Sequence, residues 1–166
     1  MSAIDIIIWI IVLGVVAAGI VIAIHYGSEI RTASDVHAEQ QNTAALVADI
    51  RQTFQGYPDY SSLSASDLIS AKAVPSAITV SGTTIDNVFG YPITLTVDSN
   101  NTNAFDLTEE VPNDACAAIA NSVLNNVISL TINGSAVTLP VTDPATIGQD
   151  CGTTNPVSIT EVYSGM

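Results

Sequence analysis

Residues 6–24 read IIIWIIVLGVVAAGIVIAI, an apolar run without a charged side chain. A helix needs about 20 apolar residues to cross the hydrocarbon core of a bilayer, so this run is long enough to span a membrane. A buried core helix is the alternative, but a small domain cannot enclose so long an apolar rod on all sides. We therefore predict a membrane-type helix near the N-terminus.

The residues before this run carry no basic side chain, since the first Lys or Arg is Arg31. A secretory signal peptide has a basic start and a small-residue cleavage site, and neither is evident here. Arg31 alone would place the C-terminal part inside the cell, because basic residues favour the cytoplasmic side. We expect that a basic leader preceded Met1 and has been removed. A gene in which Met1 is the start codon would contradict this expectation.

The helical pattern continues beyond the apolar run, through a polar stretch. Apolar residues recur at helical spacing. They are Ala33, His37, Ala44, Leu46, Val47, Ile50 and Phe54, with His37 placed on the packed face. The sequence Gly56-Tyr57-Pro58 then ends the pattern, as Gly and Pro do after a helix. This predicts one helix from near Met1 to about Phe54, roughly 80 Å long, whose first half projects and whose second half lies on a sheet.

The rest of the chain alternates short strands with short helices. Predicted strands are residues 77–80, 93–97, 104–107, 127–132, 136–139 and 157–162. A helix over 67–71 is capped by Ser64 or Ser66, a second runs from Asn113 or Asp114 to about Leu124, and a turn or helix at 142–144 leads to Cys151. Asn133-Gly134 predicts the type I′ turn of a β-hairpin.

A long helix followed by mostly antiparallel strands indicates an α+β fold, with the helix packed on a sheet. We divide the chain into three parts. Residues 1–26 are predicted to form a hydrophobic membrane helix, 27–56 its amphipathic continuation, and 57–166 a globular α+β head.

The net charge of −13 comes from 16 acidic residues against Arg31, Arg51 and Lys72. Nucleic-acid binding needs clustered Lys and Arg, so the acidic head is not expected to bind nucleic acid. The acidity is interpreted as a solubilising surface charge.

The two cysteines, Cys116 and Cys151, are far apart in the sequence. Together with an export-type segment they suggest one disulfide in an oxidising compartment, which would add roughly 3–4 kcal/mol of stability. Two free thiols are the alternative. No CxxC or His/Cys cluster of the zinc type is present.

Several residue patterns imitate functional sites. Asp98, Asn100, Thr102, Asp106 and Glu109 have calcium-loop spacing, but Asn103 stands where the loop needs Gly, so an acidic turn between strands is the better interpretation.

Other apparent sites also have simpler interpretations. Ser34, Asp35 and His37 are neighbours on one helix, a geometry unsuited to a triad. The sequon at Asn133 is explained by its hairpin, and His25 is placed at the membrane edge. We therefore predict no enzymatic activity, no metal and no cofactor.

The chain resembles the type IV pilins. The resemblance rests on the apolar N-terminal helix with a single carboxylate at Asp5, on Gly14, on the amphipathic half ending at Gly56-Tyr57-Pro58, and on a C-terminal cysteine pair. The segment 14–19, GVVAAG, and Met at position 1 are similar to the type IVb branch, which includes toxin-coregulated, bundle-forming and conjugative thin-pilus pilins. The family usually has Glu at position 5, so Asp5 is one methylene shorter.

The resemblance implies that Asp5 of one subunit pairs with the Met1 amine of a neighbouring subunit. It also implies that this N-terminal amine is methylated. An acid in hydrocarbon is costly, and its own helix offers no basic partner. The pair would set register and direction of docking, because a buried ion pair adds little net stability. The alternative is that Asp5 only reaches the headgroup zone.

Gly14 and Gly19 each weaken the helix by about 1 kcal/mol relative to Ala. The resemblance implies that this part of the helix unwinds within a filament. Close helix packing through the small residues is an equally good interpretation.

The resemblance implies a structural subunit, interpreted as the major pilin, of a type IVb-like pilus used for adhesion, aggregation or conjugation. Its partners would be other copies of itself, the inner membrane before assembly, and the prepilin peptidase and pilus assembly machinery. It would end in an extracellular pilus. The alternatives are a minor pilin, a secretion-system pseudopilin, and a membrane-anchored binding domain that never polymerises.

Overall fold

The computed structural model describes residues 32–165. The apolar run 6–24 lies outside these residues, as do the predicted boundary at residue 26 and the start of the helix. Residues 32–53 are helical, in agreement with the predicted end near Phe54. Within the described residues, no helix is both long and apolar enough to cross a membrane.

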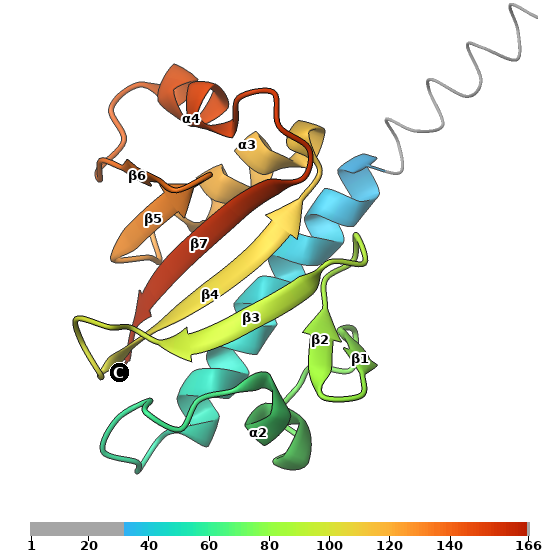
Figure 1. The fold of residues 1–166 in the computed structure, drawn as a ribbon, viewed down its shortest axis with the longest axis vertical. Coiled ribbons are helices and arrows are strands. Elements are labelled where there is room, and N and C mark those ends of the chain that lie inside the picture. Colours follow the sequence, from blue (N-terminus) through green and yellow to red (C-terminus); the bar gives the residue numbers. More distant parts are fainter. Residues whose placement is uncertain (1–31, 166) are drawn as a thin grey trace, which may run out of the picture. The chain divides into compact units, whose positions relative to one another are not determined.

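One face of this helix packs on the sheet (Figure 1). Its buried residues are Glu39, Asn42, Thr43, Leu46, Val47 and Ile50, which recur at intervals of three and four. Three residues of the predicted stripe are instead exposed, namely Ala33, His37 and Ala44. The ring of His37 hydrogen-bonds the side-chain amide of Gln41 at 3.1 Å. The buried face was predicted wrongly in this first part of the helix, because polar side chains occupy the buried positions there. They are Glu39, Asn42 and Thr43.

Seven antiparallel strands form the sheet, in the order β1-β2-β3-β4-β7-β5-β6. They are β1 (Thr79–Ser81), β2 (Thr84–Asp86), β3 (Pro92–Val97), β4 (Ala104–Val111), β5 (Ser129–Ile132), β6 (Ser135–Val137) and β7 (Val157–Ser164). The C-terminal strand β7 lies between β4 and β5. The predicted α+β architecture is confirmed.

Strands β4 and β7 are the two longest and form the centre of the sheet. Their register places Leu107 opposite Glu161 and Glu109 opposite Ile159. All four side chains are buried. Because side chains of one parity share a face of a strand, the two glutamates point to the same face as the apolar core.

The sheet differs from the sequence-based expectation at two places. The strand β2 was missed, because the short hairpin β1–β2 is largely exposed and has no apolar alternation. Strand β4 continues to Val111, beyond the expected end at Leu107. The acidic pair Glu109-Glu110 hid this continuation, since a carboxylate at an inward position breaks the expected pattern.

Three short helices complete the head. They are α2 (Ala65–Ser70), α3 (Asn113–Val123) and α4 (Pro144–Cys151). Ser64 caps α2 by accepting a hydrogen bond from the Asp67 backbone N–H, and Asp143 caps α4. The predicted side-chain cap of α3 by Asn113 or Asp114 is wrong, because Pro112 is its N-cap residue. The Asn113 side chain bonds elsewhere, as described below.

The apolar interior consists of two clusters. One joins the long helix and α2 to β2, β3 and β4, and the other joins α3 and α4 to β5 and β7. A run of aromatic rings crosses the first cluster, with centroid distances of 5.0 Å from Phe54 to Tyr60, 5.0 Å from Tyr60 to Phe105 and 5.5 Å from Phe105 to Tyr163. Such pairs stabilise a core beyond the area that they bury.

Candidate functional site

A disulfide joins Cys116 to Cys151, with the two Cα atoms 6.1 Å apart. Cys116 lies in the first turn of α3 and Cys151 is the last residue of α4, so the bond links two helices through cysteines that are 35 residues apart in sequence. Both cysteines are buried. The predicted disulfide is therefore present.

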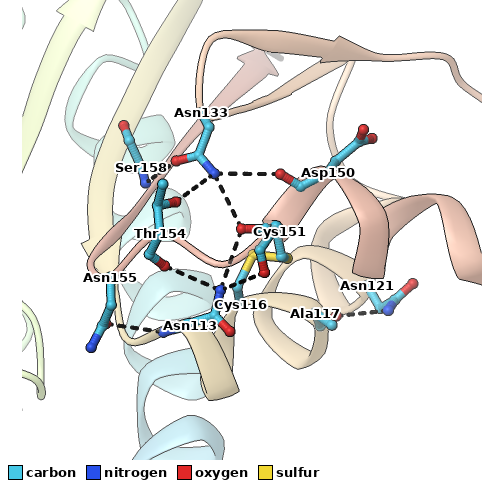
Figure 2. Close-up of a disulfide and its surroundings, with 11 residues drawn as sticks. Asn113, Cys116, Ala117, Asn121, Asn133, Asp150, Cys151, Thr154, Asn155 and Ser158 are labelled. Carbon is cyan, nitrogen blue, oxygen red and sulfur yellow. Dashed lines mark hydrogen bonds between the residues drawn. A yellow bond between two sulfur atoms is a disulfide. The ribbon is translucent and has the colours of Figure 1, made fainter.

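Asn113 holds the segment that follows this disulfide (Figure 2). Its Nδ2 donates to the backbone carbonyls of Cys151 at 3.3 Å, Gly152 at 3.0 Å and Thr154 at 3.1 Å. Its backbone N–H donates to Oδ1 of Asn155 at 3.2 Å. The loop after α4 is thus tied to the start of α3 by both a covalent bond and an amide group.

Asn133 approaches the same segment from the β5–β6 turn (Figure 2). Its Nδ2 donates to the carbonyls of Asp150 and Cys151 at 3.4 and 3.3 Å and to Oγ1 of Thr154 at 3.1 Å. Its Oδ1 accepts from the Ser158 backbone N–H at 3.3 Å.

The backbone of Asn133 also fits the predicted turn. Asn133 and Gly134 have φ angles of +50° and +79°, as a type I′ turn requires, which confirms the hairpin. The sequon nitrogen is engaged in the interactions just described, so a glycan on Asn133 would disrupt this region.

A groove of about 400 Å³ lies between the long helix, α3 and β7. It is lined by Gln40, Thr43, Ala44, Val47, Ala48, Arg51, Ser122, Val123, Asn126 and Tyr163. The side-chain amide of Gln40 bridges the two helices by donating to the Ala118 carbonyl at 3.1 Å.

Arg51 is one of the residues that line this groove. Its Nε and Nη2 donate to the Ser164 carbonyl at 3.2 and 2.9 Å, and its guanidinium carbon lies 5.8 Å from the centre of the Tyr163 ring. Arg51 therefore connects the end of β7 to the long helix through hydrogen bonds and a cation–π contact.

Three buried carboxyl groups meet between the helix and the sheet: Glu39 from the helix, Glu109 from β4 and Glu161 from β7. Glu39 accepts from the Val88 backbone N–H at 2.8 Å and from Oγ1 of Thr43 at 3.2 Å.

Glu109 and Glu161 each accept fewer hydrogen bonds than Glu39 does. Glu109 Oε2 accepts from Asn87 Nδ2 at 3.1 Å, and Glu161 Oε2 accepts from the Tyr163 hydroxyl at 2.6 Å. The Oε1 atoms of Glu109 and Glu161 are buried without a hydrogen-bond donor.

This environment changes the acidity of the cluster. Burial, followed by the charges of Glu161 and Glu39, raises the pKa of Glu109 well above its usual value. Burial raises the pKa of Glu161 to about 7, although the Tyr163 hydrogen bond opposes this shift. Burial and the neighbouring Glu161 also raise the pKa of Tyr163. Burial at this site therefore favours the protonated forms of Glu109 and Glu161.

The family model described as "PilS N terminal" matches residues 33–162, which is most of the chain. The chain belongs to the PilS family of type IV pilins. The match confirms the resemblance to the type IV pilins that was inferred from the sequence. No curated protein matches this pilin significantly.

The fold of the pilin is also that of a solved structure, TcpA, a type IV pilin from Vibrio cholerae El Tor biotype. The TM-score is 0.58 at 14% sequence identity, and the alignment covers 79% of this chain and 99% of TcpA. At this identity the likeness shows the fold. Family and fold together are those of a structural subunit of a type IV pilus, which is an extracellular filament.

The predicted docking and flexibility residues of the pilin, Met1, Asp5, Gly14 and Gly19, lie outside the described residues. Glu109, one of the calcium-loop candidates, is buried in β4. Asp98 instead makes an acidic turn, in which its Oδ1 accepts from the backbone N–H groups of Asn100 and Asn101, both at 2.7 Å. Residues 32–165 contain no group of three His, Cys, Asp or Glu side chains suited to a metal ion.

Sequence reasoning missed the carboxyl cluster. The signal was present in the pattern of the two strands. Inward positions of β4 read Phe105, Leu107, Glu109, Val111, and those of β7 read Val157, Ile159, Glu161, Tyr163. In each strand a glutamate occupies a position whose neighbours on the same face are apolar or aromatic, which is uncommon for an unpaired charge.

Proposed function

We propose that this pilin is the major subunit of a type IVb-like pilus and polymerises through its N-terminal hydrophobic helix. The observation that carries the proposal is the apolar run 6–24, preceded by the single acid Asp5, in a chain whose head belongs to a pilin family. The filament would serve adhesion, aggregation or conjugation.

In this proposal the three parts of the chain have separate roles. Residues 1–26 form the core of the filament, 27–56 connect core and head, and 57–166 form the outer surface. Gly14 and Gly19 give the core helix either local flexibility or close packing against its neighbours, because glycine both weakens a helix and removes side-chain bulk.

Asp5 would dock each incoming subunit by pairing with the Met1 amine of a subunit already in place. An isolated carboxylate among apolar helices is costly, so correct pairing is strongly preferred over a mismatched position. The result is control of register and direction.

Before assembly the proposed state is an inner-membrane protein, with the run 6–24 in the bilayer. Its partners there are the prepilin peptidase and the pilus assembly machinery, and its N-terminal amine becomes methylated.

The first test is the intact mass of the dominant protein in filaments sheared from the cell surface. We expect the mass of this chain plus one methyl group and minus the two hydrogens lost to the disulfide. Absence of the chain from sheared material, together with an unmethylated chain in the membrane fraction, would contradict polymerisation and favour the anchored binding domain.

The second test replaces Asp5. Asp5→Ala should abolish or strongly reduce filament yield while the chain still accumulates in the membrane. Asp5→Glu is the matched control, because it keeps the carboxylate and restores the residue usual in the family. Normal filament yield from Asp5→Ala would exclude the docking role.

Abundance separates the proposed major subunit from the second candidate, a minor pilin or pseudopilin. A major subunit dominates the sheared filament, whereas a minor one is found there in small amounts beside another chain. The acidic head supports neither nucleic-acid binding nor a direct role in contacting DNA during conjugation.

A further inference from the structure

The buried carboxyl cluster has no obvious role in forming a filament, yet it is the most unusual feature of the head. Glu39, Glu109 and Glu161 are each at most 1% exposed. They come from the three elements that meet at the centre of the fold, namely the long helix, β4 and β7. Burying three negative charges together would be very unfavourable, so something must neutralise them.

Cations do not supply this neutralisation within the described residues. Between residues 32 and 165 the only Lys and Arg side chains are Arg51 and Lys72. Lys72 is exposed, and Arg51 is hydrogen-bonded to the Ser164 carbonyl. Apart from the three glutamates, the titratable group in contact with the cluster within these residues is the Tyr163 hydroxyl, which donates to Glu161 and is neutral.

The hydrogen bonds also indicate that Glu109 and Glu161 are neutralised by protons and not by cations. Glu39 accepts from two donors, the Val88 backbone N–H and the Thr43 hydroxyl. Glu109 and Glu161 each have one donor and one buried oxygen, Oε1, with none.

The Glu109 carboxyl also lies against that of Glu39, where two ionised groups would repel each other. A proton on Glu109 would convert this repulsion into a hydrogen bond donated to Glu39, as happens when two carboxyl groups share a site.

We propose that Glu109 and Glu161 are protonated in the folded head and that their protons hold the long helix, at Glu39, against the sheet until the pH rises above neutral. The contact between the long helix and the sheet would therefore be sensitive to pH. Above neutral pH the protons leave to bulk water, and the resulting charges of Glu109 and Glu161 repel each other and that of Glu39. This inference does not depend on the proposed filament function.

The direction of the effect follows from the shifts. In the unfolded chain these groups lose their protons near pH 4.5, whereas Glu161 in the folded head does so near 7 and Glu109 well above its usual value. The contribution of these protons to stability is therefore full below pH 4.5, and the part due to Glu161 is lost as the pH rises from 4.5 through 7. The folding equilibrium constant should decrease by up to about tenfold per pH unit for each proton held.

The test is thermal unfolding of the full chain in a non-ionic detergent, followed by circular dichroism from pH 5 to pH 8.5. We expect the Tm to fall steadily over this range. In Glu109→Gln and Glu161→Gln the fall should become shallower, because an amide carries no titrating proton. Glu110→Gln is the matched control, since Glu110 is the exposed neighbour of Glu109 on the same strand. Its profile should follow that of the unmodified chain.

A second measurement needs no variant. With ¹³C-labelled glutamate carboxyls, nuclear magnetic resonance of the unmodified chain should show at least one carboxyl that titrates at pH 7 or above. Amide hydrogen exchange adds a local readout, because the protection of Val88 should be lower at pH 8.5 than at pH 5. A constant or rising Tm, or titration of all glutamates below pH 5.5, would overturn the proposal.

Discussion

The hydroxyl of Tyr163 donates a hydrogen bond to Oε2 of Glu161 at 2.6 Å, and both side chains lie on the inward face of β7, two residues apart. This is the only donor that the structure gives to the Glu161 carboxyl within the described residues. The bond favours the ionised carboxylate, so it opposes the effect of burial on the pKa of Glu161.

Tyr163→Phe should therefore act in two ways. It leaves a buried carboxyl without a donor, which we expect to cost ~1–3 kcal/mol. It should also raise the pKa of Glu161 further, so that the loss of stability with increasing pH extends to higher pH. Urea unfolding at pH 5, 7 and 8.5 measures both effects. An unchanged pH profile would show that the hydrogen bond does not influence the Glu161 proton.

The two functions of Asn133 can be separated by substitution. Asn133→Gly keeps the positive φ angle accessible but removes the amide, and we expect a loss of ~1–3 kcal/mol from the broken hydrogen bonds. Asn133→Ala removes the same bonds and adds the strain of a left-handed backbone, ~1 kcal/mol more. Urea unfolding of both variants measures the difference. Equal stabilities would show that the turn conformation contributes nothing.

Removing the disulfide should destabilise the head by ~4 kcal/mol, because the bond closes a loop of 35 residues in the unfolded chain. The double variant Cys116→Ala with Cys151→Ala should show this loss in urea unfolding. Reduction of the unmodified chain is the control that leaves the side-chain volumes nearly unchanged. A loss below ~1 kcal/mol would mean that the asparagine amides hold the segment without the covalent bond.

Arg51→Lys tests the attachment of β7 to the long helix. Lysine keeps the charge but cannot place two N–H groups on the Ser164 carbonyl or lie flat over Tyr163. We expect a loss of ~1 kcal/mol, because the site is partly exposed. Arg51→Met is the companion variant that keeps the length of the chain without the charge. Hydrogen exchange at residues 162–164 should increase in both, and unchanged exchange would exclude the proposed role.

The sequence predicted the parts of the fold that have regular patterns. The end of the long helix, the α3 helix and the Asn133-Gly134 hairpin each combine a periodic apolar pattern with a turn or breaker residue. The disulfide was inferred from an export-type segment and the presence of two cysteines. Each of these signals lies within a short segment, so it can be recognised in the sequence without knowledge of the tertiary structure.

The sequence did not reveal what depends on contacts between distant segments. Local rules predict Asn113 as a helix cap, whereas in the fold its amide donates to carbonyls that lie far along the chain. The same local rules predict Glu109 as part of an acidic turn. Its burial is decided by β7 and by Glu39 on the helix, and neither is visible from the residues around Glu109.

The position of β7 has a consequence for how the head is made. This last strand is hydrogen-bonded to β4 on one side and to β5 on the other, so the β1–β4 part and the β5–β6 part of the sheet are joined only through it. The sheet is therefore completed only when β7 has been synthesised, after all the other strands. A truncated chain would leave the inner edges of β4 and β5 unpaired, and open edges of this kind promote aggregation. The order of the strands thus makes the integrity of β7 a condition for obtaining a soluble head.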